Sequence, residues 1–138
     1  MRILPVLVSA VVMLAASVAG AGSPTMTRHG PCDASAAVAA GPRTFIVAND
    51  EDNILRVYGP ADAEPQPGAF DLSAFLGPEA DGQEADIEGA TRIGDVIYWV
   101  TSHGADKHGG RRLSGRRLFA TRLEILNGVL KLTPMGKP

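Results

Sequence analysis

The sequence predicts an all-β fold, and two observations lead to that prediction. From about residue 30 onward the chain consists of short runs rich in β-branched and aromatic residues, each bounded by Gly, Pro, Asn or Asp. Such runs are typical of strands separated by turns. Across this region no apolar pattern with a period of about 3.6 residues continues over about ten residues, so no long amphipathic helix is expected.

Eight runs are expected to form strands. They cover residues 34–40, 43–49, 53–59, 69–75, 87–94, 96–102, 117–125 and 128–133. The segment 71–77, DLSAFLG, is also compatible with a short helical turn. Tyr98 and Trp99 are adjacent in their run, so they should point to opposite faces of the strand and only one should enter the core.

An internal repeat suggests how these strands are grouped. DASAAVAAGPRTFIVAND, which starts at Asp33, matches DIEGATRIGDVIYWVTSH, which starts at Asp86, at a gapless offset of 53 residues. Gly41 then matches Gly94, and Val47 matches Val100. A repeat of roughly 40–50 residues with about four strands is typical of β-propeller blades.

We therefore expect about two four-stranded propeller-type blades, one over about 30–75 and the other over about 84–133. A closed propeller typically needs about four to eight blades. Three outcomes are open: the chain is part of a larger propeller, it self-associates, or its two units pack as a small sandwich. Truncation of a longer propeller is the outcome we favour.

The N-terminal stretch is typical of a secretory signal peptide. One early charge, Arg2, precedes an apolar run that ends in small residues, and Ala19-Gly20-Ala21 fits the A-x-A cleavage pattern. We expect cleavage after Ala21, a mature domain over 22–138, and a secreted or periplasmic location. An uncleaved anchor is the alternative, but the run is shorter than the about 20 apolar residues that a span needs.

Charge and cysteine content narrow the function classes. Fourteen acids and four bases lie over 22–106, whereas one acid and eight bases lie over 107–138. The two parts could pair with each other, and export together with the lack of aromatics among the bases argues against nucleic acid as a partner. The single cysteine, Cys32, excludes an internal disulfide, and burial is the commonest state of such a thiol.

The stretch EADIEG, residues 84–89, is the main candidate for a metal site. If it is a continuous strand, Glu84, Asp86 and Glu88 share one face, and calcium prefers several such carboxylate oxygens. The alternative is a solvated strand face whose acids pair with nearby arginines. The first repeat keeps Asp33 at the position of Asp86 but has Ser35 in place of Glu88, so Glu84 and Glu88 are the stronger metal candidates.

A second group of candidates follows this stretch. His103 could act as an acid or base because an imidazole titrates near neutrality. Arg111 and Arg112 could bind a phosphorylated ligand through their guanidinium forks. The alternative for both is an exposed connecting loop. NDEDN, residues 49–53, is interpreted as a turn, since it lacks the glycine and distal glutamate of a calcium-binding loop.

Several of these motifs also carry a resemblance. CDASAAV, DEDNILRVY, EADIEG, IYWVTSHG and RRLFATRLE are similar to an exported bacterial family that is catalogued as a domain of unknown function. The resemblance covers about Gly30 to Ile125 and implies a propeller-like fold within a longer chain. A weaker similarity links Asp86, Glu88, Gly89, Ser102 and His103 to phytase-like esterase propellers, and implies acids close to a metal.

These observations together predict an exported, propeller-like module that binds a ligand or a cation, Ca²⁺ being the favoured ion. One alternative is a metal-dependent phosphoesterase of the phytase-like kind. The other is a non-catalytic structural or interaction protein.

Overall fold

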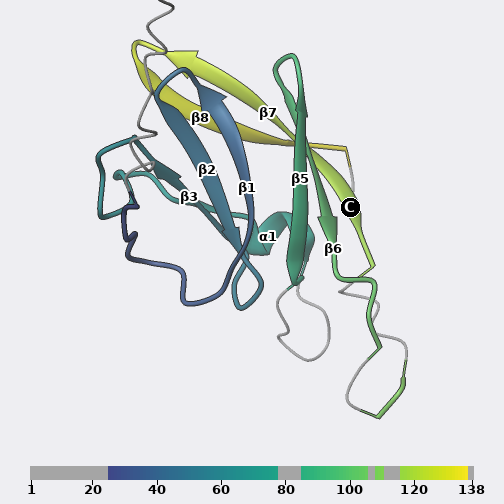
Figure 1. Ribbon diagram of the computed structural model, residues 1–138. Coiled ribbons are helices and arrows are strands. Elements are labelled where there is room, and N and C mark those ends of the chain that lie inside the picture. The colour runs from purple at the N-terminus through teal and green to yellow at the C-terminus, as the bar shows by residue number, and fades with distance from the viewer. Residues whose placement is uncertain (1–24, 78–84, 106–107, 111–115, 137–138) are drawn as a thin grey trace, which may run out of the picture.

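The computed structural model describes residues 25–77, 85–105, 108–110 and 116–136. It confirms the all-β class, since nearly all its regular structure lies in two four-stranded antiparallel sheets (Figure 1). In each sheet the strands follow one another in chain order, so neighbours in sequence are neighbours in space. The leader expected over 1–21 lies outside the described residues. Among those residues, no helix has the length and apolar character needed to cross a bilayer.

The first sheet contains β1 (Ala34–Gly41), β2 (Thr44–Asn49), β3 (Ile54–Tyr58) and β4 (Phe70–Asp71). The strand expected over 69–75 is wrong in its length, because β4 has two residues and is followed by the single turn α1 (Ser73–Leu76). The Ser73 amide donates to Asp71 Oδ1 over 2.8 Å. This short-range bond turns the chain away from the sheet and starts α1.

The second sheet contains β5 (Ile87–Ile93), β6 (Val96–Thr101), β7 (Leu118–Leu126) and β8 (Val129–Met135). β7 and β8 are joined by Asn127 and Gly128, whose φ angles are 53° and 79°. Asn-Gly is the favoured pair for a two-residue hairpin turn, because both positions need positive φ. The second sheet therefore has a full-length fourth strand where the first has only two residues.

The sheets repeat each other with one correction to the gapless alignment. In the first hairpin Gly41 pairs with Thr44, and in the second Ile93 pairs with Val96. The hairpins therefore correspond at an offset of 52 residues, not 53. The cause is a register shift in β1 between Ala39 and Gly41, which has no counterpart at this end of β5. One extra residue in β1 moves every later match by one position and to the other sheet face.

The two sheets meet along β1 and β5, which lie side by side and run in the same direction (Figure 1). Ser35 Oγ donates to the Ile87 carbonyl near the start of both strands. At the far end, an Arg92 guanidinium nitrogen donates to the Ala39 carbonyl over 3.2 Å. These contacts fix β1 and β5 as the common edge of the two sheets.

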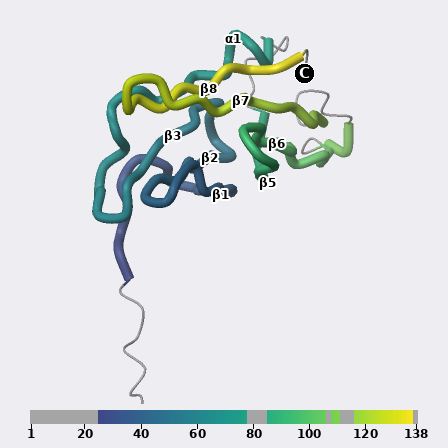
Figure 2. Tube along the Cα trace, turned by 90° about the horizontal axis from the view of Figure 1, so that it is seen from above, coloured from purple at the N-terminus to yellow at the C-terminus, as the bar shows by residue number. Residues whose placement is uncertain are grey.

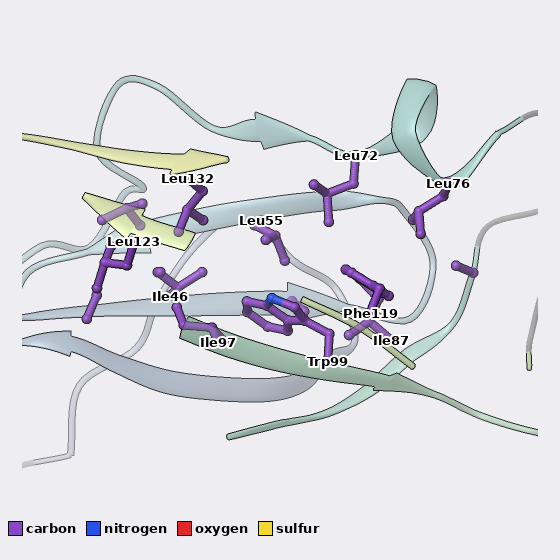
Figure 3. Packing of buried hydrophobic residues seen from close by; sticks show 14 residues of the cluster. Ile46, Leu55, Leu72, Leu76, Ile87, Ile97, Trp99, Phe119, Leu123 and Leu132 are labelled. Atoms are coloured by element: carbon purple, nitrogen blue, oxygen red, sulfur yellow. The ribbon is translucent and has the colours of Figure 1, made fainter. Parts of the chain in front are cut away.

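One hydrophobic core lies between the sheets. Figure 3 shows Trp99 among Ile46, Leu55 and Phe119. Trp99 is fully buried while Tyr98 is 38% exposed, which confirms that only one of the pair enters the core. The indole N–H donates to Thr121 Oγ1 over 3.0 Å, so its polar atom is satisfied in the core. Leu123 of β7 and Leu132 of β8 join the same cluster, and β7 and β8 extend across the first sheet in Figure 2.

The opposite face of the first sheet is covered by the chain that precedes β1. Phe45 and Tyr58 stack with ring centroids 5.6 Å apart. The Arg28 guanidinium lies 5.4 Å from the Phe45 ring centroid, and the Tyr58 hydroxyl donates to the His29 carbonyl over 2.6 Å. Cys32 in the same segment is exposed, so the expectation that this thiol is buried is wrong.

Candidate functional site

The candidate site lies at the end of the second sheet where β5 begins and β6 ends. Asp86 precedes β5 and has a φ angle of 48°, in the left-handed region. The pairing of β5 with β6 is irregular between Ile87 and Gly89, so Glu88 sits at a bulge. The continuous alternation that would place Glu84, Asp86 and Glu88 on one strand face is therefore interrupted at Asp86 and Glu88.

Ser102 connects the two chain segments at this end. Its amide donates to the Asp86 carbonyl over 3.0 Å, and its hydroxyl lies 3.3 Å from Asp86 Oδ2. Because the hydroxyl donates to a carboxylate and not to an imidazole, Ser102 is not arranged as an activated nucleophile. Its role in this geometry is to position the Asp86 side chain beside the end of β6.

His103 follows Ser102 and has a φ angle of 55°. Its Nδ1 lies 2.7 Å from the Thr101 carbonyl, which only accepts hydrogen bonds, so Nδ1 carries the proton. In the neutral ring Nε2 then has the lone pair, and this atom can accept a proton or bind a cation. The ring is exposed. The role of His103 as an acid or base stays a prediction.

The remaining predicted site residues are only partly described. Glu88 is exposed and Asp86 is half-buried, whereas Glu84, Arg111 and Arg112 lie outside the described residues. Within the described ranges, no group of three or more His, Cys, Asp or Glu side chains is close enough to hold a metal ion. The calcium site over Glu84, Asp86 and Glu88 stays a prediction.

Arg117, at the end of the arginine-rich stretch, has contacts with the fold. Its amide donates to Thr101 Oγ1 over 2.7 Å, and the Thr101 amide donates back to the Arg117 carbonyl over 3.1 Å. Its guanidinium donates to the Leu76 carbonyl at the end of α1. Arg117 therefore closes the base of the loop that carries His103.

The NDEDN turn, which joins β2 and β3 of the first sheet, contacts the chain next to the candidate site. Asn53 Oδ1 accepts the Ala85 amide over 2.9 Å, directly before Asp86. Sequence reasoning missed this contact, since Asn is common in any turn and its partner is 32 residues away. The interpretation of 49–53 as a turn agrees with this structural use of its side chains.

Asp52 in the same turn forms the best-buried ion pair among the described residues. Its carboxylate lies 2.7 Å from an Arg56 guanidinium nitrogen and also accepts the Ile54 amide over 2.9 Å. Burial opposes its ionisation, but hydrogen bonds from Arg56, Ile54 and Asn49 outweigh this and hold the pKa of Asp52 below its ordinary value of 3.8. Asp52 is thus a charged structural group of the turn.

Comparison with known proteins adds no relative. No family model, no curated protein and no solved structure matches the chain. The function is therefore inferred from the geometry of the chain itself.

Proposed function

We propose that the two sheets are adjacent blades of a propeller-like domain, and that this exported domain binds a ligand through a cation for which Glu84, Asp86 and Glu88 supply carboxylate oxygens, with His103 on the neighbouring chain segment. The resemblance to the exported bacterial family is part of this proposal and concerns the fold. It places the binding site at the end of the blades where β5 begins.

Three features support the propeller arrangement. Each sheet is a four-stranded antiparallel meander. The first strands of the two sheets, β1 and β5, run side by side in the same direction. Equivalent positions in the two hairpins are about 52 residues apart. With this offset, the face of the first sheet that packs against the second sheet is equivalent to the face of the second sheet that points away from the first. Radial repetition of blades has these properties.

The backbone at Asp86 and His103 is the observation that carries the binding site. Among the described residues, non-glycine positive φ occurs at Asp86, His103 and Asn127. Asn127 is explained by its hairpin turn. The other two lie on neighbouring chain segments joined through Ser102. Left-handed non-glycine residues are uncommon and gather at ligand sites, where the surroundings hold them in place.

Calcium titration of the purified, exported protein tests this proposal. We expect calcium to raise the melting temperature and to give a binding isotherm by calorimetry. Glu88→Ala should weaken the calcium affinity by about tenfold or more, because a carboxylate ligand is lost. Asp33→Ala is the matched control, as Asp33 is the repeat equivalent of Asp86 in the first sheet. Equal effects of the two substitutions, or no calcium response, would contradict the site.

A phosphoesterase is the second candidate, and the exposed His103 ring with Nε2 as its basic atom is the observation that favours it. It predicts calcium-dependent hydrolysis of an aryl phosphate that falls by about a hundredfold in His103→Ala. Calcium binding without hydrolysis would support the binding module and exclude this second candidate.

A further inference from the structure

The apolar surface between the two sheets continues past the closed core into the tip of the β7–β8 hairpin. Figure 2 shows β7 and β8 lying across the first sheet. Leu123 pairs with Leu132, and each of them is 6% exposed. Two residues nearer the tip, Ile125 pairs with Leu130 on the same face of the two strands. Ile125 is nevertheless 62% exposed. The row of core-facing side chains therefore ends at a surface that is open to solvent.

Two adjoining hollows lie along this open surface. One has a volume of about 290 Å³ and reaches from the turn between β1 and β2 to the hairpin tip. The other has a volume of about 250 Å³ and continues toward Val57 of β3 and Phe70 of β4. Both are lined by Gln66, Gly128 and Leu130, and we call the two hollows together the hairpin groove. Its size and its mostly apolar walls are those of a small-molecule site.

The hairpin groove is charged at one end. Arg43, in the turn between β1 and β2, lines the first hollow, whereas no charged residue lines the second. The Arg43 side chain is exposed and makes no hydrogen bond or ion pair with any described residue. Asp62 lies behind the wall, where it accepts Gln66 Nε2 over 2.9 Å, and it does not line either hollow. The guanidinium of Arg43 is therefore available to a carboxylate, which it can bind through two parallel hydrogen bonds.

The opposite end of the hairpin groove is apolar. Val57 is 4% exposed, and Phe70 and Leu130 pack partly buried against the core cluster. Val129 lines the same end and is 67% exposed. An apolar chain bound here extends the core and removes the Val129 side chain from water, which the hydrophobic effect favours.

We propose that the hairpin groove binds a medium-chain alkanoate, with its carboxylate on Arg43 and its alkyl chain along Leu130 toward Phe70. A linear molecule with one anionic head matches a groove that has one guanidinium at one end and apolar side chains at the other. The turn between β1 and β2 lies at the opposite end of the sheets from Asp86, which precedes β5 (Figure 1). The alkanoate site is therefore separate from the proposed cation site, and neither the cation nor the propeller arrangement is needed for it.

Isothermal titration calorimetry of the purified protein with octanoate, in chelator, tests this proposal. We expect a saturable isotherm. Arg43→Gln should raise the dissociation constant of octanoate by about tenfold or more, because the charge-assisted hydrogen bonds to the carboxylate are lost. Lys131→Gln is the matched control, since Lys131 is exposed on the other face of the hairpin and does not line the groove. It removes the same charge and should change the dissociation constant by less than about twofold, because a distant exposed charge is screened.

A second pair of variants tests the position of the site. Ile125 and Leu126 are 62% and 54% exposed, so an aspartate at either position should leave the fold intact. Ile125 lines the same hollow as Arg43, whereas Leu126 lines neither hollow. Ile125→Asp should weaken octanoate binding by about tenfold or more, because it places a carboxylate beside the carboxylate of the ligand. Leu126→Asp should leave the affinity unchanged, and equal effects of the two substitutions would contradict the site.

A ligand series separates the head from the tail. Butyrate has a shorter chain and should bind at least about tenfold more weakly than octanoate, since less apolar surface is buried. Octylammonium has the same tail with the opposite charge and should not bind. On addition of octanoate, backbone NMR shifts should change at Gly68, Gly128 and Leu130 and stay constant at Ser102.

Three results would overturn the proposal. They are the absence of octanoate binding, equal binding of octylammonium, and wild-type affinity in Arg43→Gln. Vesicles of phosphatidylglycerol serve as a further probe, because the hairpin tip also exposes Leu126. Binding to these vesicles without binding of octanoate would assign the tip to a lipid surface, and it too would overturn the proposal.

Discussion

The two sheets share strand order and hairpin geometry, yet the same face is buried in one and open in the other. Leu55 of the first sheet is 0% exposed, whereas Leu118, which takes the same place in the strand pairing of the second sheet, is 69% exposed. Both are leucines on the third strand of a four-stranded meander. An apolar residue on a strand face therefore provides a surface that can pack. Whether that surface becomes part of the core depends on which element lies opposite it in space.

The largest loss of stability is expected for Trp99, which extends from the second sheet into the core between the two sheets. Trp99→Ala should lower the free energy of unfolding by about 3–5 kcal/mol, because it removes a buried aromatic ring and leaves Thr121 without its indole donor. Urea denaturation followed by far-UV circular dichroism measures this loss. Trp99→Phe keeps most of the bulk and should lose less, which preserves the test if the alanine variant fails to fold. A loss below about 1 kcal/mol for Trp99→Ala would mean that the sheets do not pack through it.

The next largest effect compares the matched leucines directly. Leu55→Ala should destabilise the protein by about 2–5 kcal/mol, the range for deleting a buried leucine side chain. Leu118→Ala should change the stability of the monomer by no more than about 0.5 kcal/mol, since its side chain is already in water. Thermal melts at low protein concentration measure both. Equal losses for Leu55→Ala and Leu118→Ala at low concentration would break the comparison between the two sheets.

The smallest expected change in stability comes from the ion pair of Asp52 with Arg56, and it depends on pH. Asp52→Asn should lower the stability by about 1 kcal/mol at about pH 7, because the pair with Arg56 is half-buried and hydrogen-bonded. The folded-state pKa of Asp52 is below the ordinary 3.8, so its contribution is present above that value. It is lost as the pH falls through the lower, folded-state pKa.

Melts of wild type and Asp52→Asn across the acid range test this sign, and the difference between them should vanish in strong acid. Asp95→Asn is the control in the second sheet. Its pair with Arg122 is 3.6 Å long with both side chains at least half exposed, so little change is expected. A difference for Asp52→Asn that grows in acid would contradict the assignment.

Part of the candidate site could be read from the chain alone. His103 and Asp86 drew attention because of their residue types and their place after and before strand runs. The left-handed backbone at both positions could not be foreseen, because Asp and His tolerate it better than most residues but adopt it at only a small fraction of positions. The Ser102 bonds to Asp86, and the Asn53 bond to Ala85 across 32 residues, come from that same non-local packing.

Most strands, their turns and the opposite facing of Tyr98 and Trp99 could be predicted from the sequence, because alternation and turn chemistry act over a few neighbouring residues. Which of the two rings enters the core depends on the packing of the sheets. The tertiary structure also reduced the fourth strand of the first sheet to Phe70–Asp71, and it moved the repeat by one residue through the irregularity near Gly41. It also left Leu118 open where Leu55 is buried, since burial depends on which surface lies opposite in space.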